Sequence, residues 1–227
     1  MNTKQLLGRT KRARRNLALK LVLERRFKPE LTAYFNKIIK EFRTFYIATG
    51  RTIDVNSFSD DTKSLLKKHY LRVSNAFSDE MRVSDVGKSM RYQKQSEEEV
   101  AGIVDASLIV YVNQKVPERG VVLDQTTMRD IDDSVIEAQT TLADDGDELT
   151  NAAIGVLASS ILKRKVDSRK STINATETQF MSESTKLVEA TVVASEGSVD
   201  VENVIGALAV SVAVGTKRWA SVLEIRS

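Results

Sequence analysis

The chain has 227 residues, 41% of them hydrophobic and 29% charged, so it can bury a sizeable core and is expected to be globular. The lack of cysteine excludes disulfides and thiolate metal sites, and the single histidine argues against a histidine metal cluster, so we expect no cofactor. The net charge is only +3, so a basic surface requires an uneven distribution of charge.

The first 28 residues carry ten lysines and arginines and only one acidic residue, Glu24. We predict a basic arm, residues 1–28, that contacts nucleic-acid phosphates or an acidic protein surface. Its candidate contact residues are Arg9, Lys11, Arg12, Arg14, Arg15, Arg25 and Arg26. A solvated helix start is the competing interpretation, because no aromatic side chain precedes Phe27 to stack on bases.

A helical body is predicted over residues 29–168. Apolar residues from Leu17 to Ile47 recur at helical spacing, and Pro29 is expected to divide this run into two helices, the second ending at Gly50. A further helix is predicted to start at Ser59 or Asp60 and to continue through residue 81. His69 lies beside its apolar stripe and is interpreted as a packed or surface histidine.

Two more helices and a junction complete the predicted body. A helix or strand from residue 100 should stop at Pro117 and Gly120, and another helix should run from about residue 126 to the turn at residues 144–147. The spacing of acidic residues in that turn does not fit an EF-hand loop. A helix over residues 149–164 and a polar junction at residues 166–171, with a domain boundary, are predicted to follow.

The carboxyl-terminal part, residues 169–227, is predicted to be a small α+β unit. Residues 173–190 have helical spacing, and Glu177 lies on a largely inward face, where an unpaired charge is costly. We expect Glu177 to pair with Lys217, Arg218 or Arg226. Residues 207–214 fit a helix or a strand, and the alternation after Val210 favours a strand; residues 217–225 alternate as a strand does. The predicted fold is therefore mainly α, with several amphipathic helices before this unit.

Two separated motifs carry a family resemblance: Thr176-Glu177 in a helix, and then a strand that contains Lys217, Arg218, Trp219, Glu224 and Arg226. In this order they resemble the phage Mu F-like head morphogenesis (minor head protein) family, with Glu224 where that family usually has Asp. The resemblance covers about the last quarter of the chain. The family pattern usually continues past this arginine, so we expect a gene product that is longer, truncated or cleaved.

The resemblance implies a minor structural protein of a tailed-phage head, at the portal vertex, acting in head assembly and in DNA packaging or ejection. The implied partners are the portal or major capsid protein and possibly packaged double-stranded DNA, with multiple copies in a virion assembled in the host cytoplasm. The alternative is a DNA-binding accessory protein that works through its basic arm. No membrane span is expected, because the longest apolar run, residues 204–214, is too short.

An enzyme is not expected. The sequence has no Gly-rich phosphate loop, no nucleophile elbow and no cysteine nucleophile. The acidic pairs Asp132-Asp133 and Asp144-Asp145 are adjacent in sequence, which favours a solvated face over a positioned acid and base.

Overall fold

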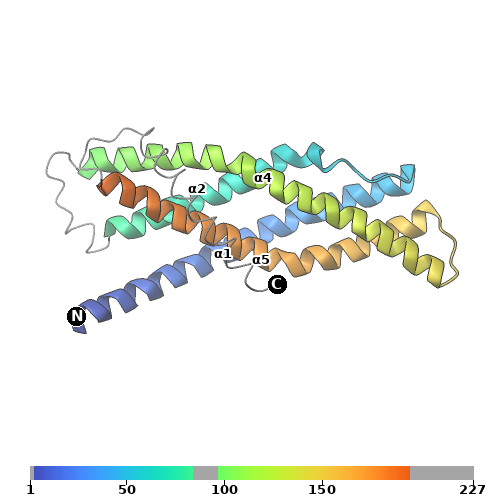
Figure 1. Cartoon of the computed structure of the whole chain (residues 1–227), viewed down its shortest axis with the longest axis horizontal. Helices are drawn as coiled ribbons and strands as arrows, with labels where there is room; N and C mark the ends of the chain where they lie inside the picture. Colours follow the sequence, from blue (N-terminus) through green and yellow to red (C-terminus); the bar gives the residue numbers. More distant parts are fainter. Residues whose placement is uncertain (1–2, 84–96, 195–227) are drawn as a thin grey trace, which may run out of the picture. The chain divides into compact units, whose positions relative to one another are not determined.

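The computed structural model describes residues 3–83 and 97–194 (Figure 1). In these ranges the chain forms α1 (Thr3–Thr49), a 3-10 turn η1 (Val55–Phe58), α2 (Ser59–Val83), α4 (Glu97–Asp144) and α5 (Asn151–Ala194), and no strand. The mainly helical class is therefore confirmed for this part of the chain. The predicted strands of the carboxyl-terminal unit lie outside the described residues.

The chain divides into two compact units. The first unit comprises Met1–Tyr70 and Lys115–Gln179, and the second comprises Leu71–Gln114 and Phe180–Ser227. Among the described helices, none has a stretch long and apolar enough to cross a membrane.

The first unit is a bundle of four helical segments, from α1, α2, α4 and α5. Apolar residues at helical spacing supply its core because they fall on one face of each segment. The fully buried side chains on α1 include Phe27, Leu31, Phe35, Ile38 and Phe42. Gly155 of α5 allows close approach to α1, since a Cβ there would lie 2.9 Å from Ile47 Cγ1.

The second unit contains segments of α2, α4 and α5, and its interior is rich in small hydroxyl side chains. The hydroxyl of Tyr111 on α4 lies 3.0 Å from Ser184 Oγ of α5, within hydrogen-bonding distance. The Tyr111 ring stacks on the ring of Phe180, with centroids 6.5 Å apart. Buried apolar residues such as Phe77 alternate with hydroxyls. The buried hydroxyl residues are Ser74, Ser78, Ser107, Ser182, Ser184 and Thr185.

Two predicted helix breaks at proline are wrong. Pro29 lies inside the continuous α1, and Pro117 lies inside α4, which also contains Gly120. A proline removes one backbone hydrogen bond and costs about 3 kcal/mol within a helix. Here the neighbouring turns are buried on the core side, and this apolar burial offsets the local cost.

The polar junction predicted at residues 166–171 is also wrong, because these residues are helical and lie within α5. Arg169 explains the polar composition. Its Nη1 lies 2.6 Å from Asp130 Oδ2 of α4, and its guanidinium lies over the ring of Phe35 of α1. The polar side chains therefore mediate helix pairing and do not mark a loop.

The helix ends predicted at Gly50 and at the turn of residues 144–147 are confirmed. Gly50 has φ +66° just after α1, and its N–H donates to the Tyr46 carbonyl at 2.8 Å. Gly146 has φ +73° in the turn after α4. The start of α2 at Ser59 is also confirmed. The turn before it, η1, is capped by Asp54, whose side chain accepts a hydrogen bond from the Asn56 N–H.

Candidate functional site

A buried polar layer links three helices of the first unit. Glu177 of α5 is only 8% exposed and accepts a hydrogen bond from the hydroxyl of Tyr70 on α2. The guanidinium of Arg119 on α4 binds both carboxylate oxygens of Glu177, with Nε 3.2 Å from Oε2. This two-point contact fixes the orientation of the guanidinium as well as neutralising the buried charge.

The predicted burial of Glu177 and its need for a basic partner are confirmed, but the partner is Arg119. Lys217, Arg218, Trp219, Glu224 and Arg226 lie outside the described residues. The sequence does contain a signal for Arg119. Val116 lies three residues before it and Leu123 four residues after it, so on a continuous helix Arg119 borders the apolar face that they and Gly120 form. That signal was missed because Pro117 was expected to end the helix.

Burial and charge keep Tyr70 and Arg119 protonated. Burial raises the pKa of Tyr70, and the nearby carboxylate of Glu177 raises it further, so the phenol stays protonated. Burial alone would lower the pKa of Arg119, but the hydrogen bonds and charge of Glu177 outweigh it and the pKa is raised. The layer is thus suited to holding helices together.

His69 is fully buried next to this layer, as a packed histidine. Its ring stacks on Phe27 of α1 with centroids 3.8 Å apart, and its Nε2 lies 3.0 Å from Thr178 Oγ1 of α5. The neighbouring Thr176, in contrast, is exposed. Of the predicted Thr-Glu motif, therefore, Glu177 faces the bundle interior and Thr176 faces outward.

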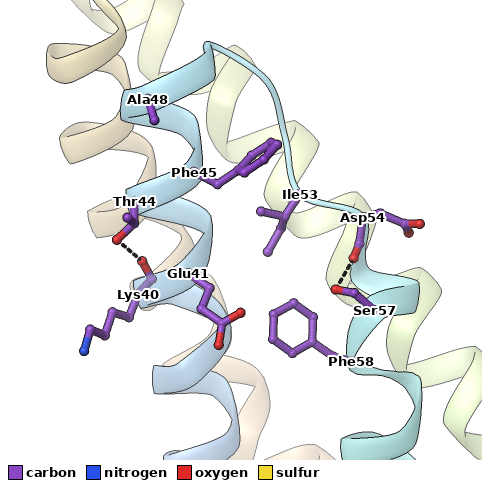
Figure 2. A pocket seen from close by; sticks show the side chains of 9 residues that line it. All are labelled: Lys40, Glu41, Thr44, Phe45, Ala48, Ile53, Asp54, Ser57 and Phe58. Carbon is purple, nitrogen blue, oxygen red and sulfur yellow. Dashed lines mark hydrogen bonds between the residues drawn. The ribbon is translucent and has the colours of Figure 1, made fainter.

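An open groove lies between the carboxyl-terminal turns of α1 and the segment that leads through η1 (Figure 2). Its volume is about 660 Å³. Phe45, Ala48, Ile53 and Phe58 form an apolar floor, and charged side chains stand at its edge (Figure 2). We call it the Phe45–Phe58 groove.

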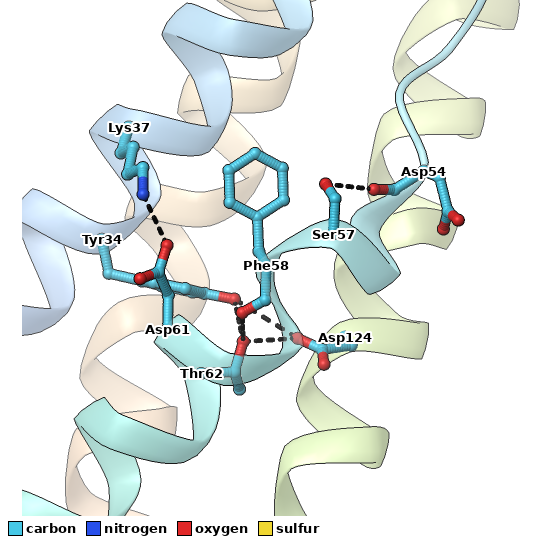
Figure 3. Close-up of polar contacts among 8 residues, drawn as sticks. All are labelled: Tyr34, Lys37, Asp54, Ser57, Phe58, Asp61, Thr62 and Asp124. Carbon is cyan, nitrogen blue, oxygen red and sulfur yellow. Dashed lines mark hydrogen bonds and ion pairs between the residues drawn. The ribbon is translucent and has the colours of Figure 1, made fainter.

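A second buried polar cluster joins α1, α2 and α4 (Figure 3). Thr62 Oγ1 lies 2.6 Å from the Tyr34 hydroxyl and 2.7 Å from Asp124 Oδ1. Burial raises the pKa of Asp124, although the hydrogen bonds from Thr62 and Tyr34 oppose this rise. Burial also raises the pKa of Tyr34. The sequence did not predict this cluster, because its members are far apart along the chain.

The predicted basic arm is the amino-terminal half of α1. Lys11, Arg14, Arg15, Arg25 and Arg26 are all exposed, while the side chains of Arg9 and Arg12 lie outside the described part of the structure. At about 100° per residue these five side chains occupy a sector about 120° wide, opposite the buried Leu23, Phe27 and Leu31. We call this face, about 22 Å long from Lys11 to Arg26, the basic stripe.

Among the described residues, no group of three or more His, Asp or Glu side chains is placed to hold a metal ion. Comparisons with protein-family models, with curated proteins and with solved structures gave no match to this chain. The resemblance to the Mu F-like family therefore stays a prediction.

Replacing Glu177 with alanine should destabilise the fold, because it leaves the half-buried Arg119 without its carboxylate. We expect a loss of about 2–4 kcal/mol in the free energy of unfolding, measured with urea. Glu118→Ala is the matched control, since it breaks an exposed pair with Lys115 on the same helix and should cost under about 0.5 kcal/mol. Equal losses in the two variants would contradict a structural role for the layer.

Asp124→Asn should change the pH dependence of stability. The folded-state pKa of Asp124 is raised above 3.8, so between that value and the raised pKa the folded state binds more protons than the unfolded state. Wild-type stability then contains a contribution that is lost as pH rises through this window, and Asn lacks it. The variant should gain stability relative to wild type with rising pH.

Urea unfolding measured at a series of pH values checks this. Asp133→Asn, at an exposed position of the same helix, controls for the removal of one charge. A stability difference between wild type and Asp124→Asn that is the same at every pH would refute the prediction.

Proposed function

We propose that this chain is a structural subunit of a tailed-phage head that works by binding other components and has no enzymatic activity. The observation that carries the proposal is the basic stripe, a row of cations on one face of α1, whose opposite face is packed in the bundle from Leu23 onward. The assignment to a phage head comes from the resemblance of Thr176-Glu177 and of residues 217–226 to the Mu F-like minor head protein family.

The anchoring of α1 supports a docking role for the stripe. Asn174 of α5 donates to the Glu24 carbonyl at 2.9 Å, Lys20 binds Gln179, and Phe27 stacks on His69. These contacts hold the inward side of the same turns that present Arg25 and Arg26 outward. Cations fixed on a rigid helix lose less conformational entropy on binding than cations on a mobile tail.

The internal pairing of buried polar groups favours binding over catalysis. Glu177 is bonded to Arg119 and Tyr70, Asp124 to Thr62, and Asp130 to Arg169. Catalytic acids and bases need access to a substrate, and these carboxylates are instead used to join helices. In the proposed role the partners are the portal or major capsid protein, at the portal vertex of the virion head, with several copies assembled in the host cytoplasm.

The test is incorporation into heads of the phage whose genome encodes the chain. Reversing Arg14, Arg15, Arg25 and Arg26 to Glu should lower the amount that co-sediments with purified heads by at least about tenfold. The matched control reverses four exposed cations elsewhere, at Arg43, Lys67, Arg129 and Lys163. Absence of wild-type protein from purified heads would remove the proposal.

A DNA-binding accessory role is the second candidate, favoured by the same five cations. If the basic stripe contacts duplex DNA, the logarithm of the binding constant should fall linearly with the logarithm of salt concentration. Alanine at Arg14, Arg15, Arg25 and Arg26 should make that slope shallower by about 0.9 for each phosphate that the variant no longer neutralises. Fluorescence anisotropy of labelled duplex measures the slope, and binding that is absent or insensitive to salt dismisses this candidate.

A further inference from the structure

We propose that copies of this chain associate head to tail, with the outer face of the amino-terminal half of α1 in one copy seated in the Phe45–Phe58 groove of the next. The inference rests on the proposed function in one respect, that the basic stripe is a docking element. It adds the partner of that element, a second copy of the same chain.

The stripe is not only basic. Between its two groups of cations, Leu21 and Val22 expose 46% and 45% of their surface, and Leu17 beside them exposes 59%. Phosphate backbones offer nothing to bury these aliphatic side chains, because contacts to phosphates are made by charges and hydrogen bonds. An amphipathic helix with apolar anchors and flanking cations suits a groove with an apolar floor and acidic edges.

The Phe45–Phe58 groove has that character. Its volume of about 660 Å³ is in the range that accommodates several apolar groups. Phe45, Ala48, Ile53 and Phe58 provide apolar surface, and Glu41 and Asp54 stand at the edge (Figure 2).

The charge around the groove is net negative. Next to it are two further carboxylates, Asp60 and Asp61, at the start of α2. The nearby cations are three lysines: Lys40, Lys37, which pairs with Asp61 at 2.5 Å (Figure 3), and Lys63, which lies 3.5 Å from Asp60. Four carboxylates against three lysines leave a net charge of −1 beside the groove, which is the sign that complements the stripe.

The two surfaces of one copy cannot meet. Val22 and Phe45 lie on the same continuous helix, and 23 intervening steps at about 1.5 Å each separate them by about 35 Å. A stripe can therefore enter only the groove of another molecule. Such a contact joins two different surfaces, so it is heterologous, and repetition gives a ring if the rotation closes and a filament if it does not.

Sedimentation velocity of the full chain over a range of concentrations tests the proposal. The wild type should form species larger than a monomer as concentration rises. A stripe variant, Leu21→Glu with Val22→Glu, and a groove variant, Phe45→Lys with Ala48→Lys, should each weaken association at least about tenfold. All four positions are exposed, so helicity by circular dichroism should be unchanged.

Mixing the two variants separates a head-to-tail contact from other kinds of association. Each variant keeps one intact surface, so an equimolar mixture should form a one-to-one dimer although neither variant assembles alone. Ile136→Glu, at a 62% exposed apolar position on α4, is the control and should assemble as the wild type does.

Three outcomes would overturn the inference: a monomeric wild type, association that survives both variants, or a mixture that stays monomeric. Binding of duplex DNA or of purified heads by a wild type that stays monomeric would overturn the inference and leave the proposed function standing. A wild type that assembles head to tail but binds neither purified heads nor duplex DNA would overturn the proposed function and leave this inference standing.

Discussion

The contact of Glu177 with Arg119 and Tyr70 is the interaction on which the first unit depends, because it joins α5 to α4 and α2 at one level of the bundle. Apolar side chains pack in many registers with similar energies, whereas a buried carboxylate tolerates few. A shift of α5 by one turn would separate the Glu177 carboxylate from the Arg119 guanidinium and the Tyr70 hydroxyl, at a cost of several kcal/mol. The neighbouring stack of His69 on Phe27 brings α1 into the same level of the bundle.

The helical class, the helix ends at Gly50 and Gly146 and the burial of Glu177 could be predicted because each depends on local spacing and residue type. The predictions at Pro29, at Pro117 and at residues 166–171 failed because each took a local signal as decisive. Tertiary burial on both sides keeps the helices continuous through the prolines, and Arg169 is polar because it pairs with Asp130. The Tyr34–Thr62–Asp124 cluster depends on which helices pack together, and spacing within one helix does not contain that information.

The basic stripe and the Phe45–Phe58 groove occupy opposite ends of one helix, and the bundle between them is closed by internally paired polar groups. Since the polar groups inside the bundle are paired with one another, the basic stripe and the groove are the surfaces that we propose for recognition. Charges that stay in water contribute to association rate and orientation, while the aliphatic side chains between them contribute binding energy on burial. The proposed roles in a phage head and in self-association both follow from this arrangement of α1.

The serine- and threonine-rich interior of the second unit has a mechanical consequence. Small hydroxyl side chains do not interlock as large aliphatic ones do, and an O–H can exchange one acceptor for another with little loss. Segments packed through Ser182 and Ser184 therefore resist sliding along their axes less than segments packed through Phe35 or Ile131. Shear between helices, rather than opening of the bundle, is the deformation that this interior favours.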